Sequence, residues 1–358
     1  MSDDGDDLPT DFSTNVDLTN SSSNKTKKKP ANMSPLRKLM HAFNLLGYIT
    51  VLTTYLIATY SEAGINGVND SELLDKHPTL LTPNYKSTKF IWGVIFFTQG
   101  VFAVAQLLLP RCRDHILLLE GIGPMYILAC VAQVIWYATF AYDLLITSIV
   151  FLFGVFVCVV GLLARQYQLF RAAEMKIYHS KNTSDTVVPG ASIHQKEGYG
   201  IDDGYLLLRL PFGIYAGWIA SWLPLMLSIV LVSLNVDATS LTWVAVMSVA
   251  LLTGLSMGLL LRKEHGMPSY SMPLVIAYFF CGVRVELEAP DDIILAMYDE
   301  AYLSLMKNVS AIAAVMLLAT IVARFVAVYL RDRCTKKEEE NEAYDPTTGL
   351  DGVDYVQA

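Results

Sequence analysis

Long apolar segments alternate with short polar ones through most of the chain. A helix needs about 20 mostly apolar residues to cross the hydrocarbon core of a bilayer. Eight segments reach that length, and almost none of them carries a charge near its middle. The pattern therefore predicts eight membrane-spanning segments, at about 39–60, 90–109, 122–141, 144–164, 210–234, 241–261, 271–287 and 307–330.

Lipid offers no hydrogen-bond partner to an open strand edge, so segments of this kind form helices. The predicted fold is all-α, a polytopic transmembrane helical bundle over residues 39–331. Residues 1–38 begin acidic and turn basic at 25–29, and residues 332–358 are acidic. Both flanking segments lack the large apolar residues that bury a core, and we expect disordered cytosolic tails there.

Composition agrees with lipid as the surrounding solvent. Hydrophobic residues make up 53% of the 358 residues and charged residues only 17%, whereas soluble domains average roughly 25% charged residues. The net charge of −8 arises in the tails and loops. In the loop 288–306, Asp291 or Asp292 is placed to cap a short interfacial helix, and a plain acidic loop is the alternative.

Lysine and arginine positions predict the orientation. If the N-terminus is cytosolic, 20 of the 26 basic residues fall in cytosolic segments and 4 in the opposite ones. This asymmetry favours a multi-pass protein with both termini in the cytosol, in an endomembrane or the plasma membrane. Asn69 is then the expected glycosylation acceptor, in a non-cytosolic loop. The basic stretch 25–38 abuts the first span, a position that favours contact with anionic lipid.

Several classes of chemistry lack their usual residues. No span carries a convincing midplane charge, which argues against an ion-coupled carrier. The sequence has no P-loop, no nucleophile elbow, no zinc-binding motif and no cluster of metal ligands. We therefore expect no enzyme activity, no cofactor or metal, and no nucleic-acid partner.

Glycines four residues apart make a flat stripe on a helix, where another backbone can approach closely. Two such pairs occur, Gly213 with Gly217 and Gly254 with Gly258. Packing between spans of the same chain is the simpler interpretation. A homodimer is the alternative.

All five tryptophans lie in or beside the spans. Trp92, Trp136 and Trp243 lie near the non-cytosolic ends, where tryptophan commonly anchors a helix at the headgroups. Trp218 and Trp222 lie further into their span and share one helix face with the nearby Tyr215. That aromatic face either packs against neighbouring helices or lines an apolar ligand cavity.

Three glutamines inside the spans, Gln99, Gln106 and Gln133, need hydrogen-bond partners in hydrocarbon. Bonds between helices and polar contacts to a ligand both satisfy this need.

Four motifs carry a family resemblance. They read TPNY at 82–85, FIWGVI at 90–95, QVIW at 133–136 and PFGIYAGWI at 211–219. They resemble motifs of tryptophan-rich membrane proteins distantly related to the TspO/MBR (translocator or peripheral benzodiazepine receptor) family. The resemblance covers the first six spans. Gln133 departs from it, because those proteins carry asparagine at that position.

TspO-like proteins bind porphyrins, sterols and other flat hydrophobic molecules in an aromatic-lined helical pocket. The resemblance implies that this chain binds a tetrapyrrole- or sterol-like molecule as a sensor, carrier or regulator. Two alternatives come from other classes, a secondary transporter without obvious ion coupling and a membrane scaffold that acts through its tails. The candidate ligand-binding residues are Trp92, Gln99, Gln133, Trp136, Tyr215, Trp218 and Trp222.

Overall fold

The computed structural model describes residues 35–60, 70–108, 121–183, 209–262 and 270–343. Within these ranges the chain is helical and contains no strand, which confirms the predicted all-α fold. Asn69 and most of the basic stretch 25–38 lie outside the described residues.

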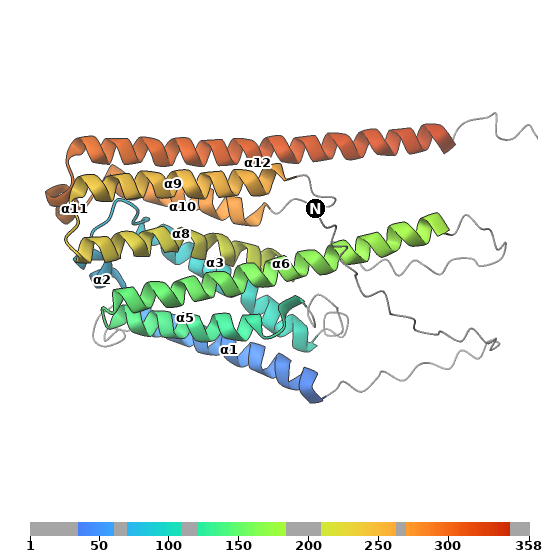
Figure 1. Ribbon diagram of the computed structural model, residues 1–358, viewed down its shortest axis with the longest axis horizontal. Coiled ribbons are helices and arrows are strands. Elements are labelled where there is room, and N and C mark those ends of the chain that lie inside the picture. The colour runs from blue at the N-terminus through green and yellow to red at the C-terminus, as the bar shows by residue number, and fades with distance from the viewer. Residues whose placement is uncertain (1–34, 61–69, 109–120, 184–208, 263–269, 344–358) are drawn as a thin grey trace, which may run out of the picture.

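Each predicted span corresponds to one long helix, and the long helices lie side by side along a common direction (Figure 1). Two short helices, α2 (Asp70–Lys76) and α11 (Asp292–Met297), lie at the same end of this bundle. The long helices are α1 (Pro35–Tyr60), α3 (Tyr85–Leu108), α5 (Met125–Ala141), α6 (Leu145–Thr183), α8 (Leu210–Ser233), α9 (Ala238–Leu261), α10 (Ser271–Glu288) and α12 (Glu300–Ala343).

Six of these helices, α1, α3, α6, α8, α9 and α12, are long and apolar enough to cross a membrane. α5 is apolar but has only 17 residues. α10 has 18 residues and carries three charged side chains near its C-terminal end, Arg284, Glu286 and Glu288. Because α5 and α10 have shorter apolar stretches, the polar loops or charged side chains at their ends lie closer to the middle of the bundle than those of the six long helices.

Two helices extend into the segments for which we expected disorder. Helix α1 already begins at Pro35, and proline is well suited to the first turn of a helix. Helix α12 continues to Ala343, so residues 332–343 are helical although we expected disorder there. This stretch is rich in lysine and glutamate, which favour helix, and it extends an existing helix without a new nucleation step.

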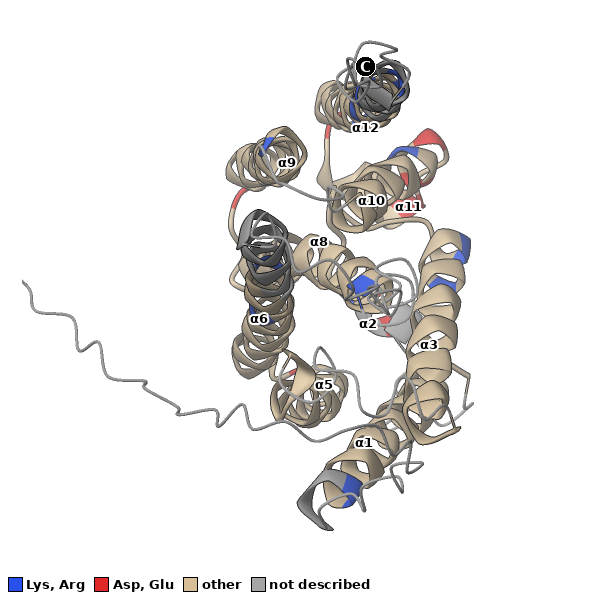
Figure 2. Cartoon of the chain, turned by 90° about the vertical axis from the view of Figure 1, so that its right-hand side faces the viewer, with Lys and Arg blue, Asp and Glu red and all other residues tan. Residues whose placement is uncertain are grey.

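The bundle has two groups of helices, best seen end-on (Figure 2). Helices α1, α3, α5, α6 and α8 form one group, and α9, α10 and α12 pack against it mainly through α8, with a smaller contact between α10 and α3. Helix α8 lies at the centre, since 67% of its span is buried inside the protein compared with 17% for α12. The core of the protein therefore surrounds the helix that carries the PFGIYAGWI motif.

The two glycine pairs have different surroundings. A Cβ atom added at Gly217 would lie 2.8 Å from the carbonyl oxygen of Met272 on α10, so only glycine permits this close contact between α8 and α10. Gly213 also faces α10, next to Ser271. Gly254 and Gly258 meet nothing within 4 Å and lie on an exposed face of α9.

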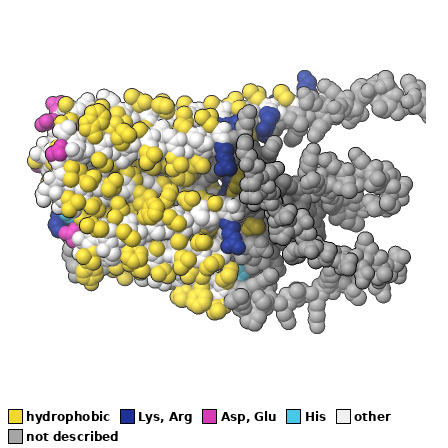
Figure 3. Space-filling model, viewed as in Figure 1, with side chains coloured by type: hydrophobic (Ala, Val, Ile, Leu, Met, Phe, Trp, Pro, Cys, Tyr) yellow, Lys and Arg dark blue, Asp and Glu magenta, His cyan; other side chains and the backbone are white. Residues whose placement is uncertain are grey.

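A broad band of apolar side chains surrounds the bundle between two differently charged ends (Figure 3). Lysine and arginine gather at one end, which we call the basic end, where Arg209 and Arg262 both lie over the ring of Tyr167. Aspartate and glutamate gather at the opposite end, the acidic end, which carries α2, α11 and the turn between α5 and α6.

Candidate functional site

Eight aromatic side chains from five helices contact one another in the half of the bundle near the acidic end. We call this set the aromatic cluster. Trp92 of α3 lies at its centre, with ring centroids 5.5 Å from Tyr55, 6.4 Å from Trp136 and 6.3 Å from Trp218. The members are Tyr55, Trp92, Phe96, Trp136, Tyr137, Trp218, Trp222 and Phe279.

A cavity of about 360 Å³ opens beside this cluster. Its inner wall is aromatic and comes from α1, α3, α5 and α8, with Trp92, Trp136 and Trp222 among the lining residues. Its mouth is formed by α2, by residues 82–89 and by side chains from α10 and the start of α11. The cavity is thus apolar inside and polar at the acidic end.

The segment 82–85 forms part of the mouth because it is fixed to α10. The backbone N–H of Asn84 donates to the carbonyl oxygen of Gly282 at 3.0 Å, and its side-chain amide donates to Glu286 Oε2, also at 3.0 Å. A Cβ at Gly282 would lie 3.3 Å from Cβ of Pro83. The close contact explains why a polar TPNY segment is needed where α3 begins against α10.

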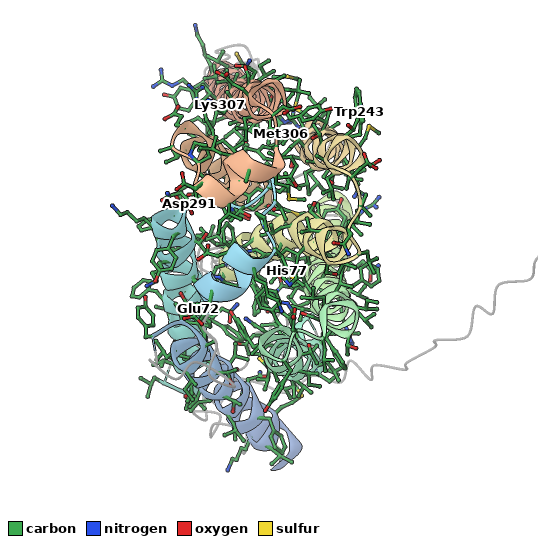
Figure 4. All side chains as sticks on the ribbon, turned by 90° about the vertical axis from the view of Figure 1, so that its left-hand side faces the viewer. Glu72, His77, Trp243, Asp291, Met306 and Lys307 are labelled. Carbon is green, nitrogen blue, oxygen red and sulfur yellow. The ribbon has the colours of Figure 1, made fainter. Side chains whose placement is uncertain are left out.

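A second set of contacts holds α2 across the acidic end (Figure 4). The Lys76 ammonium and His77 Nε2, the latter at 3.1 Å, contact the carboxylate of Asp143 in the α5–α6 turn. Asp143 has a left-handed backbone with φ 57°, a conformation that aspartate tolerates in tight turns. Burial alone would raise the pKa of Asp143, but hydrogen bonds from Lys76 and His77 lower it overall.

The indole N–H groups of Trp136 and Trp222 have no hydrogen-bond partner, although both side chains line the cavity and are 1% and 5% exposed. A buried polar group without a partner costs roughly 1–3 kcal/mol. The N–H of Trp218, behind the cavity wall, also lacks a partner. These nitrogen atoms have almost no accessible surface, so the donors lie within the packed wall, and other parts of the Trp136 and Trp222 rings face the cavity.

The buried amides form a separate set, which we call the amide layer. Gln133 Oε1 accepts a hydrogen bond from Tyr215 at 2.5 Å, and Gln99 Oε1 accepts one from Tyr126 at 3.2 Å. None of these four residues is among those that line the cavity. Closer to the basic end, Gln106 Oε1 contacts Asn44 Nδ2 at 3.1 Å and His41 Nδ1 at 3.3 Å.

The model of the TSPO-like protein family matches residues 41–323, which span all eight long helices. The chain belongs to the TSPO-like protein family. It is a multi-pass membrane protein in contact with the lipid bilayer. No curated protein and no solved structure matches it.

The structure of this TSPO-like protein divides the seven candidate residues between two environments. Trp92, Trp136 and Trp222 line the cavity. Trp218 lies behind them, with its ring centroid 6.3 Å from those of Trp92 and Trp222. The other three, Gln99, Gln133 and Tyr215, are buried in the amide layer.

Other cavity-lining residues of the TSPO-like protein were not among the sequence candidates. Tyr137 follows Trp136 directly, so the second aromatic residue was a usable signal. The carboxylates of Asp75, Glu286 and Asp291 also line the cavity. No motif marks them, because they come together only when α2, α10 and α11 meet at the acidic end.

Proposed function

We propose that this protein binds a flat, apolar small molecule, tetrapyrrole- or sterol-like, in the cavity beside the aromatic cluster. The observation that carries the proposal is a cavity of about 360 Å³ whose inner wall includes the rings of Trp92, Trp136 and Trp222. A bound apolar molecule would bury its surface against these rings.

The shape of the ligand follows from the walls. Trp92, Trp136 and Tyr137 line the cavity, and the rings of Trp136 and Tyr137 stack at an interplanar angle of 30°. A planar ligand can stack on such faces and bury a large apolar area. The cavity volume of about 360 Å³ falls within the range of about 300–1,000 Å³ typical of small-molecule sites.

We further propose that all eight long helices span the membrane with both termini in the cytosol. The gathering of lysine and arginine at the end where α1 begins supports this orientation. The cavity then opens toward the non-cytosolic surface. A sensor, carrier or regulator of an extracytosolic or membrane-dissolved molecule would have this arrangement, with no chemical conversion of the ligand.

Binding of two uncharged probes, octaethylporphyrin and cholesterol, to the full-length protein in nanodiscs tests the proposal. Porphyrin binding is followed by the emission of the porphyrin, and cholesterol by its competition with the porphyrin. We expect saturable binding that weakens at least about tenfold in Trp222→Leu, which removes the ring from the cavity wall.

Trp243→Leu is the matched control. Trp243 is 61% exposed on α9 and lies away from the cavity (Figure 4). This variant should bind the porphyrin within twofold of the parent. Absence of saturable binding for both probes would overturn the proposal, and so would equal weakening by the two substitutions.

A further inference from the structure

The mouth of the cavity is negatively charged. Three carboxylates line it, Asp75 from α2, Glu286 from α10 and Asp291 from the start of α11, against one ammonium group, Lys89. Asp291 lies beside the end of α3 and α2 in the view onto the acidic end (Figure 4). A ligand that enters by this route therefore passes acids from three separate elements.

No ion pair neutralises these carboxylates within the described part of the chain. The ion pairs found there join Lys76 and His77 to Asp143, and Arg284 to Glu288. Glu286 receives a hydrogen bond from the neutral amide of Asn84. Asp75 is affected by its neighbours, since burial raises its pKa and the charges of Asp291 and Glu72 raise it further.

The one lining cation has aromatic neighbours. Lys89 Nζ lies 4.0 Å from the ring centroid of Tyr85 and 4.5 Å from that of Tyr60. Both distances are within the range of a cation–π contact, which stabilises the ammonium without using a carboxylate. The charge at the mouth consequently stays negative.

An inorganic cation does not fit this arrangement. Among the residues that the structure describes, no group of three or more His, Cys, Asp or Glu side chains is placed to hold a metal ion. The carboxylates surround an opening whose inner wall is aromatic. An organic ligand with a cationic end and an apolar body satisfies both features.

We infer that the cavity selects flat apolar molecules that carry a cationic amine at one end, and that it discriminates against carboxylates. The amine lies among the three acids at the mouth, and the apolar body lies against the aromatic inner wall. This inference rests on the proposed function and narrows its ligand class. Charge-assisted hydrogen bonds of an ammonium to a carboxylate are stronger than neutral ones.

Three probes with one ring system separate charge from shape: 9-(aminomethyl)anthracene, 9-anthracenemethanol and 9-anthracenecarboxylate. Each is titrated by its own emission into the full-length protein in nanodiscs of zwitterionic phosphatidylcholine, so that the lipid adds no net charge. We expect the cation to bind at least about tenfold more tightly than the anion, with the neutral alcohol between them.

Substitutions of the mouth carboxylates test whether these groups cause the expected order of probe affinities. The substitutions Asp75→Asn with Glu286→Gln should reduce the difference in affinity between cation and anion to less than about threefold, while the alcohol still binds saturably. Asp75→Asn alone, on the exposed face of α2, should reduce it partway. Glu288→Gln is the control, because this carboxylate pairs with Arg284 and does not line the cavity, and the order should persist.

The outcomes separate the inference from the function on which it rests. Equal binding of all three probes, or tightest binding of the carboxylate, would overturn the charge selection and leave ligand binding intact. Persistence of the order in both variants would also overturn it. Failure of every probe to bind would count against the proposed function and the inference together.

Discussion

The aromatic cluster and the amide layer use largely the same helices, yet their side chains have different environments. In the amide layer, the side-chain oxygens of Gln99, Gln106 and Gln133 each accept a hydrogen bond from another helix, while their Nε2 donors have no partner. In the aromatic cluster, the rings of Trp136 and Trp222 line a cavity of about 360 Å³.

This difference separates packing from binding. A buried polar atom that finds a protein partner stabilises one arrangement of helices. An aromatic ring that lines a cavity offers a face on which a bound molecule can bury apolar area. The residue type alone does not distinguish the two roles, since tryptophan and glutamine both occur in buried positions here.

The largest expected effect comes from a substitution that disrupts the aromatic cluster and the amide layer together. Gly217→Val places a branched side chain where even a Cβ would lie 2.8 Å from the Met272 carbonyl oxygen and 3.0 Å from Cβ of Val275. Because backbone occupies this space, α8 and α10 must separate, at a cost of roughly 1–3 kcal/mol or more. We expect a clear fall in melting temperature in detergent and loss of porphyrin binding.

The second glycine pair supplies the control for this substitution. Gly258→Val, on the exposed face of α9, adds its side chain to open space and should keep both the melting temperature and the binding. Equal tolerance of the two substitutions would show that the contact between α8 and α10 is not tight. The contact between α8 and α10 would then not be what holds the aromatic cluster and the amide layer in place.

A substitution with a smaller expected effect distinguishes the amide layer from the aromatic cluster. Tyr215→Phe leaves the ring but removes the hydrogen bond to Gln133 Oε1, an acceptor that is then buried without this donor. The expected loss of stability is about 1–3 kcal/mol, measured as a lower melting temperature. Porphyrin affinity should stay within twofold of the parent, because neither residue lines the cavity.

Trp222→Leu should instead weaken porphyrin binding strongly, in addition to any loss of packing around this buried side chain. Comparable loss of binding in Tyr215→Phe and Trp222→Leu would mean that the amide layer belongs to the ligand site. The division into a packing region and a binding region would then be wrong.

Hydropathy predicted the helices well because the length of an apolar segment is a property of the sequence itself. It did not predict which side of a helix faces inward. The depth of Trp92 along α3 is typical of a headgroup anchor, but its side chain is only 3% exposed and lies at the centre of the aromatic cluster. Trp243, at a similar depth in α9, faces outward.

The sequence likewise does not predict which charged side chains face the mouth of the cavity. Arg284 and Glu286 lie two residues apart, so they point to different sides of α10. Arg284 pairs with Glu288 at 3.1 Å on the surface, while Glu286 faces the cavity and Asn84. Partners as far apart in sequence as Asn84 and Glu286 meet only through helix packing, and no local pattern of residues indicates that contact.

The smallest expected effect concerns the contact that holds α2 at the acidic end. The pKa of Asp143 is lower in the folded protein than its ordinary value, about 3.9. Its contribution to stability is therefore present above that ordinary value and is lost as the pH falls through the lower folded pKa. Asp143→Asn should lower the melting temperature at neutral pH by about a degree or two, since partly exposed ion pairs contribute little.

As the pH falls below the ordinary pKa value of Asp143, the difference between Asp143→Asn and the parent should shrink, because the parent carboxylate becomes protonated. Because α2 lines the cavity and not the amide layer, we also expect about twofold weaker porphyrin binding in this variant. Asp292→Asn removes a carboxylate at the same end that neither lines the cavity nor contacts Lys76, and it should change neither quantity. A loss that stays constant from neutral to acidic pH would show that the side-chain shape of Asp143, and not its charge, holds α2 in place.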